Sequence, residues 1–147
     1  MGLIQDIGQG PICLDTVIFI YFMEEHEKYL PLIEPIFEAI DKGHFKAYTS
    51  GITLLETLVV PLRAQDNELV NQYSYLLMES HGLKMLDLDW KLLHQAAWLR
   101  AKLGIKTPDA LQLAAALISK CTSFITNDRR MPNLANVRVL QLSDYLR

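Results

Sequence analysis

The stretch ICLDTVIFIYF, residues 12–22, is an almost unbroken apolar run that contains one acidic residue, Asp15. The run is rich in Ile and Val and shows no helical period, so residues 12–20 are predicted to form a buried strand, with Asp15 inside it or at its end. An unpaired carboxylate in such a strand costs several kcal/mol. Asp15 therefore needs a cation, a hydrogen-bond network or a place at the end of the strand.

The length and composition favour one globular domain. The chain has 147 residues, of which 50% are hydrophobic, so we expect a single domain over residues 1–147 with a substantial core. The apolar runs are too short to cross a bilayer and the N-terminus has no secretory pattern, so a cytoplasmic protein without a membrane partner is expected. Cys13 and Cys121 lie far apart in apolar surroundings, which favours buried, unreactive thiols.

The charge is unevenly distributed along the chain. The net charge is only -3, but residues 100–147 hold eight Lys/Arg against three Asp/Glu, whereas residues 1–99 hold six against fourteen. This basic third could form a surface that faces phosphates. Solvated charges without a partner explain the same pattern equally well.

Helical and strand patterns alternate after residue 22. Helices are predicted from Pro31 to Gly43 and at 53–60, 67–79, 90–103 and 107–120. Pro61 is expected to end the second helix and Gly104 the fourth. The last three helices are expected to begin at Asp66 or Asn67, at Asp89 and at Thr107. Strands are predicted at 45–50, 83–88, 123–126 and 137–142, followed by a short turn at 143–146. Such alternation favours an α/β sandwich with a mostly parallel sheet, because parallel neighbours need helical crossovers.

Four carboxylates are expected at one edge of this sheet, where the strands have their carboxyl ends. Asp15 follows the start of the first strand and Asp128 follows the strand at 123–126, so both can project at that edge, and Glu56 and Asp109 are placed in the first turns of helices that start there. Three of them also have a clear structural explanation: Glu56 follows Thr53 in a capping-box pattern, Asp109 suits a helix N-terminus, and Asp128 lies in a turn-rich segment. Asp15 is harder to explain in this way.

A cation would explain these acids together. Converging carboxylates without His or Cys nearby form an all-oxygen site, which suits Mg²⁺ or Mn²⁺ better than zinc. Such ions can activate water and stabilise an in-line displacement at phosphorus. The pattern therefore indicates phosphoester chemistry.

These residues resemble the motifs of PIN-domain ribonucleases, and in particular the VapC-like toxins of toxin–antitoxin modules. ICLDTVIFIYF resembles the family's first strand with its Asp, and TSGITLLETL (49–58) resembles the segment that carries its Glu. LGIKTPDALQLAAAL (103–117) and FITNDRRM (124–131) resemble the third-acid and Thr-x-Asp motifs. The resemblance covers nearly the whole chain, with the motifs in the family's order and spacing.

The resemblance implies a three-layer sandwich around a five-stranded parallel sheet of order 3-2-1-4-5, a homodimer, and an antitoxin that covers the active cleft. It also implies Mg²⁺ or Mn²⁺ as the cofactor. The implied metal ligands are Asp15, Glu56, Asp109 and Asp128, with Thr16 and Thr126 as hydroxyl residues that orient a carboxylate or the bound water. Asn127 falls at a variable position, and Val17 stands where many members have Asn or Ser.

The function that follows is hydrolysis of RNA phosphodiester bonds by a metal-activated water, with no protein nucleophile. Unpaired RNA is the expected substrate, because bases in a duplex are not accessible for selection. Candidates for holding its backbone are Arg63, Arg100, Arg129 and Arg130. Tyr73, Tyr75, Met78 and Trp98 are either dimer or antitoxin contacts or ordinary core and surface residues.

Other classes fit less well. A haloacid-dehalogenase-type site needs a second Asp two residues after the first, and Val17 is there. A receiver domain needs a Lys after the last strand, and dinucleotide binding needs a glycine-rich motif after a strand; the sequence has neither. The remaining alternative is a PIN-like module that binds RNA or protein without catalysis, in which a cluster of repelling carboxylates has no evident use.

Overall fold

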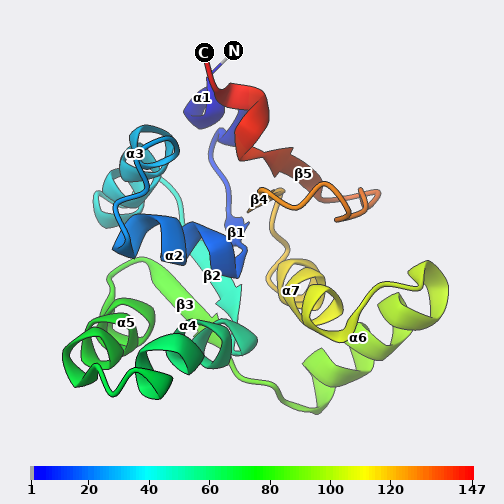
Figure 1. Cartoon of the computed structure of the whole chain (residues 1–147). Coiled ribbons are helices and arrows are strands. Elements are labelled where there is room, and N and C mark those ends of the chain that lie inside the picture. The colour runs from blue at the N-terminus through cyan, green and yellow to red at the C-terminus, as the bar shows by residue number, and fades with distance from the viewer. Residues whose placement is uncertain (1) are drawn as a thin grey trace.

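A five-stranded sheet forms the centre of the molecule. The computed structural model describes residues 2–147. The strands are β1 (Ile12–Leu14), β2 (Ala47–Ser50), β3 (Leu83–Leu86), β4 (Ser123–Thr126) and β5 (Arg138–Gln141). They pair in the order β3-β2-β1-β4-β5, and every pair is parallel (Figure 1). The sheet order implied by the resemblance is confirmed.

Helices cover both faces of the sheet. They are α1 (Leu3–Ile7), α2 (Thr16–Met23), α3 (Leu30–Asp41), α4 (Ile52–Arg63), α5 (Asn67–Glu79), α6 (Trp90–Leu103) and α7 (Thr107–Ile118), followed by the 3-10 turn η1 (Leu142–Tyr145). In β1, Ile12 and Leu14 join the core under α1, α2, α3 and α5, whereas Cys13 joins the core under α6 and α7. This alternation gives the predicted three-layer α/β sandwich.

The prediction for residues 12–20 was wrong beyond Leu14. The strand ends there, and α2 begins at Thr16 with Asp15 as its N-cap. The helix shows no amphipathic period because it packs on several sides: Ile18 and Phe19 are fully buried, and other residues of the helix pack partly buried against the same core. Asp15 therefore lies at the junction of a strand and a helix.

The helix α4 also differs from the prediction. Pro61 does not stop it, because a proline near the C-terminus removes a single backbone bond, and the chain recovers when the N–H of Ala64 bonds the carbonyl of Val60. The N-cap is Gly51, so Thr53 lies inside the helix and the capping box is absent. Glu56 consequently lies beyond the first turn.

Most other boundaries agree with the prediction. Asp66 and Asp89 cap α5 and α6 through the N–H groups of Leu69 and Leu92. The helix α1 was not predicted. Both cysteines are buried and free, as expected. Within residues 2–147, none of the helices has the length and apolar character needed to cross a membrane.

Candidate active site

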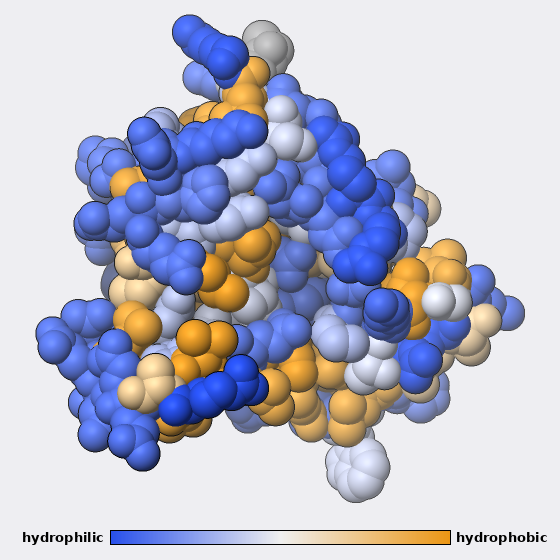
Figure 2. Space-filling model, in the orientation of Figure 1, coloured by the Kyte–Doolittle hydropathy of each residue, from blue (hydrophilic) through white to orange (hydrophobic). Residues whose placement is uncertain are grey.

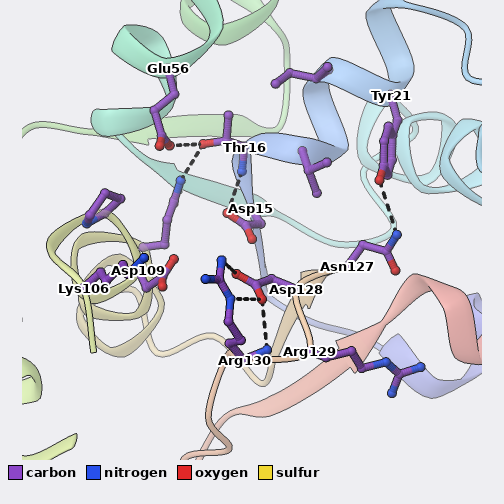
Figure 3. A pocket seen from close by; sticks show the side chains of 14 residues that line it. Asp15, Thr16, Tyr21, Glu56, Lys106, Asp109, Asn127, Asp128, Arg129 and Arg130 are labelled. Carbon is purple, nitrogen blue, oxygen red and sulfur yellow. Dashed lines mark hydrogen bonds and ion pairs between the residues drawn. The ribbon is translucent and has the colours of Figure 1, made fainter. Parts of the chain in front are cut away.

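All four predicted carboxylates line one cavity of about 630 Å³. Asp15 follows β1, Asp128 follows β4, Glu56 comes from α4 and Asp109 from the first turn of α7 (Figure 3). Because β1 and β4 are adjacent and parallel, their carboxyl ends open onto the same space, as in other open α/β sheets. Figure 2 shows a hollow near the centre of the face, bordered by both hydrophilic and hydrophobic residues.

Asp15 is held by two donors and is still hard to ionise. Its Oδ1 accepts from the N–H of Thr16 at 2.8 Å and its Oδ2 from the hydroxyl of Thr126 at 2.6 Å. The pKa of Asp15 is raised to about 6 as the net result of opposing effects: burial raises it most, the two hydrogen bonds lower it, and the negative charges of Asp109 and Glu56 raise it by less. The carboxylate therefore carries an uncompensated cost when it is charged.

The two predicted hydroxyl residues contact carboxylates of the cavity. Thr16 Oγ1 donates to Glu56 Oε1 at 2.7 Å. Thr126 donates to Asp15 and accepts from the backbone N–H of Asp128 at 3.0 Å, so it joins the ends of β1 and β4. Val17 also lines the cavity, so the cavity wall is apolar at the position where many members of the resembled family have Asn or Ser.

Asp128 and Asp109 are in different electrostatic environments. Arg130 bonds both carboxylate oxygens of Asp128, at 3.1 Å each, and these bonds place the pKa of Asp128 below its usual value (Figure 3). Burial, and next the charge of Asp128, raise the pKa of Asp109. A cation of the chain thus compensates one acid, while Asp15 and Asp109 are disfavoured as anions.

The other predicted arginines lie less centrally. Arg129 lines the cavity but turns away to Asp144 and Ser143 (Figure 3). Arg100 bonds the carbonyl of Ile105 instead, and neither it nor Arg63 lines the cavity.

Sequence reasoning missed two residues of the site. Gln112 lines the cavity, and it is the only polar residue of α7 after Asp109, which was an available signal. Tyr21 also lines the cavity and accepts a hydrogen bond from Asn127 at 3.3 Å. The apolar pattern predicts a strand over residues 12–20, so the sequence does not indicate that Tyr21 contributes to the site.

The donor set fits a hard divalent cation in its chemistry. The carboxylates offer only oxygen as a ligand atom. The pKa values of Asp15 and Asp109 are raised by burial first and by neighbouring acids second, so a bound cation would relieve a cost that both carboxylates carry when ionised. In the part of the chain that the structure describes, residues 2–147, no three His, Cys, Asp or Glu side chains are close enough together to hold one ion. Asp128 in particular is engaged by Arg130.

The fold and the site define a family. The model of the PIN domain matches residues 12–137, and the chain belongs to this family. No curated protein matches it significantly in sequence.

Several solved structures share the fold. One is VapBC2 from Rickettsia felis bound to a DNA fragment from its promoter, with 20% identity, a TM-score of 0.67, and coverage of 88% of this chain and 97% of that chain. FitAcB from Neisseria gonorrhoeae has 20% identity, a TM-score of 0.67, and coverage of 90% and 99%. A toxin–antitoxin complex from Klebsiella pneumoniae has 19% identity, a TM-score of 0.63, and coverage of 86% and 95%. At these identities the likeness establishes the fold.

Proposed function

We propose that the protein is a metal-dependent endoribonuclease that hydrolyses RNA phosphodiester bonds as the toxin of a toxin–antitoxin module. The observation that carries the proposal is that four carboxylates from four separate elements line one cavity. Strongly shifted carboxyl groups in a cleft are typical of functional sites. The raised pKa of Asp15 is such a shift.

The proposed ligands of Mg²⁺ or Mn²⁺ are the carboxylates of Asp15, Glu56, Asp109 and Asp128. When bound, the ion would lower the pKa of a water molecule and stabilise the charge that develops on the phosphoryl oxygens. Thr126 and Thr16 hold the carboxylates of Asp15 and Glu56 by hydrogen bonds. The nucleophile in this proposal is a water molecule and not a side chain.

Unpaired RNA is the proposed substrate. Lys106 and Arg130 add positive charge to the cavity wall, where they can contact the phosphate backbone. Tyr21 also lines the cavity, and its aromatic ring stacks on Tyr29 with centroids 4.9 Å apart. An aromatic ring beside cations is the usual means of binding single-stranded nucleic acid, because each base has a face that can stack.

Two protein partners are proposed. The similar structures include toxin–antitoxin complexes, which supports a cognate antitoxin that covers this cavity in the cytoplasm. A homodimer is supported by the apolar surface of α4 (Figure 2), where four large side chains are exposed. They are Leu55, Val59, Val60 and Leu62. Of the residues suggested by the sequence, Tyr75, Met78 and Trp98 are exposed and suit a partner surface, whereas Tyr73 is buried.

The test is cleavage of single-stranded RNA by the purified protein with Mg²⁺ or Mn²⁺, with EDTA, and with Asp109→Asn as the inactive control. We expect cleavage by the wild type only when the ion is present, and none by the variant. Equal cleavage by Asp109→Asn would contradict the proposed site. RNA binding without cleavage under every condition would favour the non-catalytic module.

A further inference from the structure

A buried polar group lies beneath Thr16 and Glu56. The group is a cluster of three side chains, Gln112 of α7, Thr49 of β2 and Thr53 of α4, and each residue is at most 1% exposed. None of these three was expected to serve the site. Buried polar groups need complete hydrogen bonding, so the direction of each bond can be worked out from its partners.

The carboxamide of Gln112 has one possible orientation. The backbone N–H of Ser50, which can only donate, points at Gln112 Oε1 at 3.2 Å. The amide nitrogen then faces two hydroxyls and donates to Thr16 Oγ1 at 3.0 Å and Thr53 Oγ1 at 2.8 Å. A flipped amide would set a donor against the N–H of Ser50.

The hydroxyl protons are also assigned. Thr49 donates to the carbonyl of Leu14 at 2.8 Å, so in its 2.7 Å bond with Thr53 it is the acceptor. Thr53 uses its own proton in that bond. The longer contacts, 3.2 Å from Thr16 to Thr53 and 3.5 Å from Thr49 to Gln112, would require protons that shorter bonds already use.

Thr16 is the end of this chain of bonds. Its oxygen accepts one hydrogen of the Gln112 amide, and its single proton is directed to Glu56 Oε1 at 2.7 Å. The direction of the Thr16 hydroxyl therefore depends on a residue that is 96 positions away in the sequence.

We propose that Gln112 is a positioning residue, which fixes the hydroxyl of Thr16 and through it holds the carboxylate of Glu56 at the cavity. Gln112 lies three residues after Asp109 on α7, and both side chains line the cavity. One helix thus supplies the carboxylate of Asp109 directly and sets the position of Glu56 through Thr16. The proposal rests on the proposed function, in which both acids bind the metal.

A purely structural role makes a different prediction. If the network only stabilises the core, loss of Gln112 lowers the melting temperature and leaves metal binding by the folded protein unchanged. If Gln112 positions Glu56, metal binding weakens as well, because partners that orient ligands contribute about 10- to 100-fold to metal affinity.

The experiment is calorimetric titration of Mn²⁺ into the wild type, Gln112→Met, Thr16→Val and the double variant. We expect Gln112→Met to weaken binding at least about tenfold. The double variant should bind no more weakly than Thr16→Val, because both changes remove one path to Glu56. Tyr145→Phe, which loses a bond to Asp6 outside the cavity, is the matched control and should keep the wild-type affinity. In RNA cleavage, kcat of Gln112→Met should fall while KM changes little.

Equal Mn²⁺ affinity of Gln112→Met and wild type, or fully additive effects in the double variant, would overturn the proposal. A wild type that binds no Mn²⁺ would refute the proposed function and the inference with it, and this is seen before any variant is made. If Gln112→Met does not fold, NMR of the wild type decides. The side-chain amide signals of Gln112 should shift during Mg²⁺ titration in parallel with metal binding, and unchanged signals would overturn the proposal.

Discussion

Asp15→Asn separates the cost of the Asp15 charge from its benefit. Asn has nearly the same shape and no charge, so the substitution removes the repulsion by Asp109 and Glu56 and the penalty of burying an anion. It keeps an acceptor for the N–H of Thr16, as expected of an N-cap residue. The metal-free variant should therefore be more stable than the wild type near neutral pH.

The magnitude follows from the pKa of Asp15, which rises from 3.8 to about 6 on folding. At about 1.4 kcal/mol per unit, ionisation costs the native state about 3 kcal/mol. Between these two values the native state binds more protons than the unfolded state, so the free energy of unfolding falls as the pH rises. With the Asn oxygen on the N–H of Thr16, its amide nitrogen faces the hydroxyl of Thr126 and cannot accept that proton, which costs about 1 kcal/mol. The variant is therefore expected to be more stable than the wild type by about 2 kcal/mol at pH values above the pKa of native Asp15.

The assay is urea unfolding of both proteins at about pH 4 and about pH 7.5, without metal and with excess Mg²⁺. The free energies of unfolding of the two proteins should differ little at the lower pH and by about 2 kcal/mol at the higher pH. Saturating Mg²⁺ should then stabilise the wild type by about 2.7 kcal/mol at a concentration of 100 Kd, and the variant by less. The reasoning is refuted if Asp15→Asn is less stable by the same amount in all four conditions and still cleaves RNA, because Asp15 would then be structural only.

Three further predictions concern the metal and the RNA. Activity lost in EDTA should return with excess Mg²⁺ or Mn²⁺ and should not need zinc, because all proposed ligands are oxygens; full cleavage in EDTA would exclude the metal mechanism. Arg130→Ala should tighten Mn²⁺ binding, because it frees the carboxylate of Asp128. It should also reduce by about one the slope of the logarithm of RNA affinity against the logarithm of salt concentration. Arg129 is bonded to Asp144, so Arg129→Ala should leave Mn²⁺ binding unchanged. Tyr21→Leu should weaken binding of single-stranded RNA by about 1 to 3 kcal/mol in fluorescence anisotropy, and Tyr21→Phe should not; equal losses would mean that the hydroxyl, and not the ring, is what matters.

The sheet and the set of acids were predictable because both follow from local patterns. Buried strands alternating with helices allow few topologies, and the parallel rule places the carboxyl ends of neighbouring strands at one edge. Asp15 and Asp128 could therefore be assigned to the same place although 113 positions separate their numbers in the sequence. The motif resemblance added the order of the strands, which periodicity alone did not supply.

The parts that were missed depend on tertiary contacts. The helix α2 packs on several sides, so it lacks the period that distinguishes a helix from a strand. The role of Thr53 was misread, because a capping box and a buried hydroxyl network use the same residue types. Gln112 stood out only as a polar residue in an apolar helix, and its partners come from three other elements.

We infer from the position of Asp15 that its charge, and not only its shape, serves the proposed site. A residue that merely caps α2 could be Ser or Asn, which accept the same hydrogen bond without an ionisation cost. The N–H of Thr16 and the hydroxyl of Thr126 would ordinarily lower the pKa of a carboxyl group, and yet the pKa of Asp15 stays at about 6. Burial and the neighbouring acids thus outweigh both donors. We propose that a cation in the cavity offsets this cost, to which burial contributes most and the charges of Asp109 and Glu56 add.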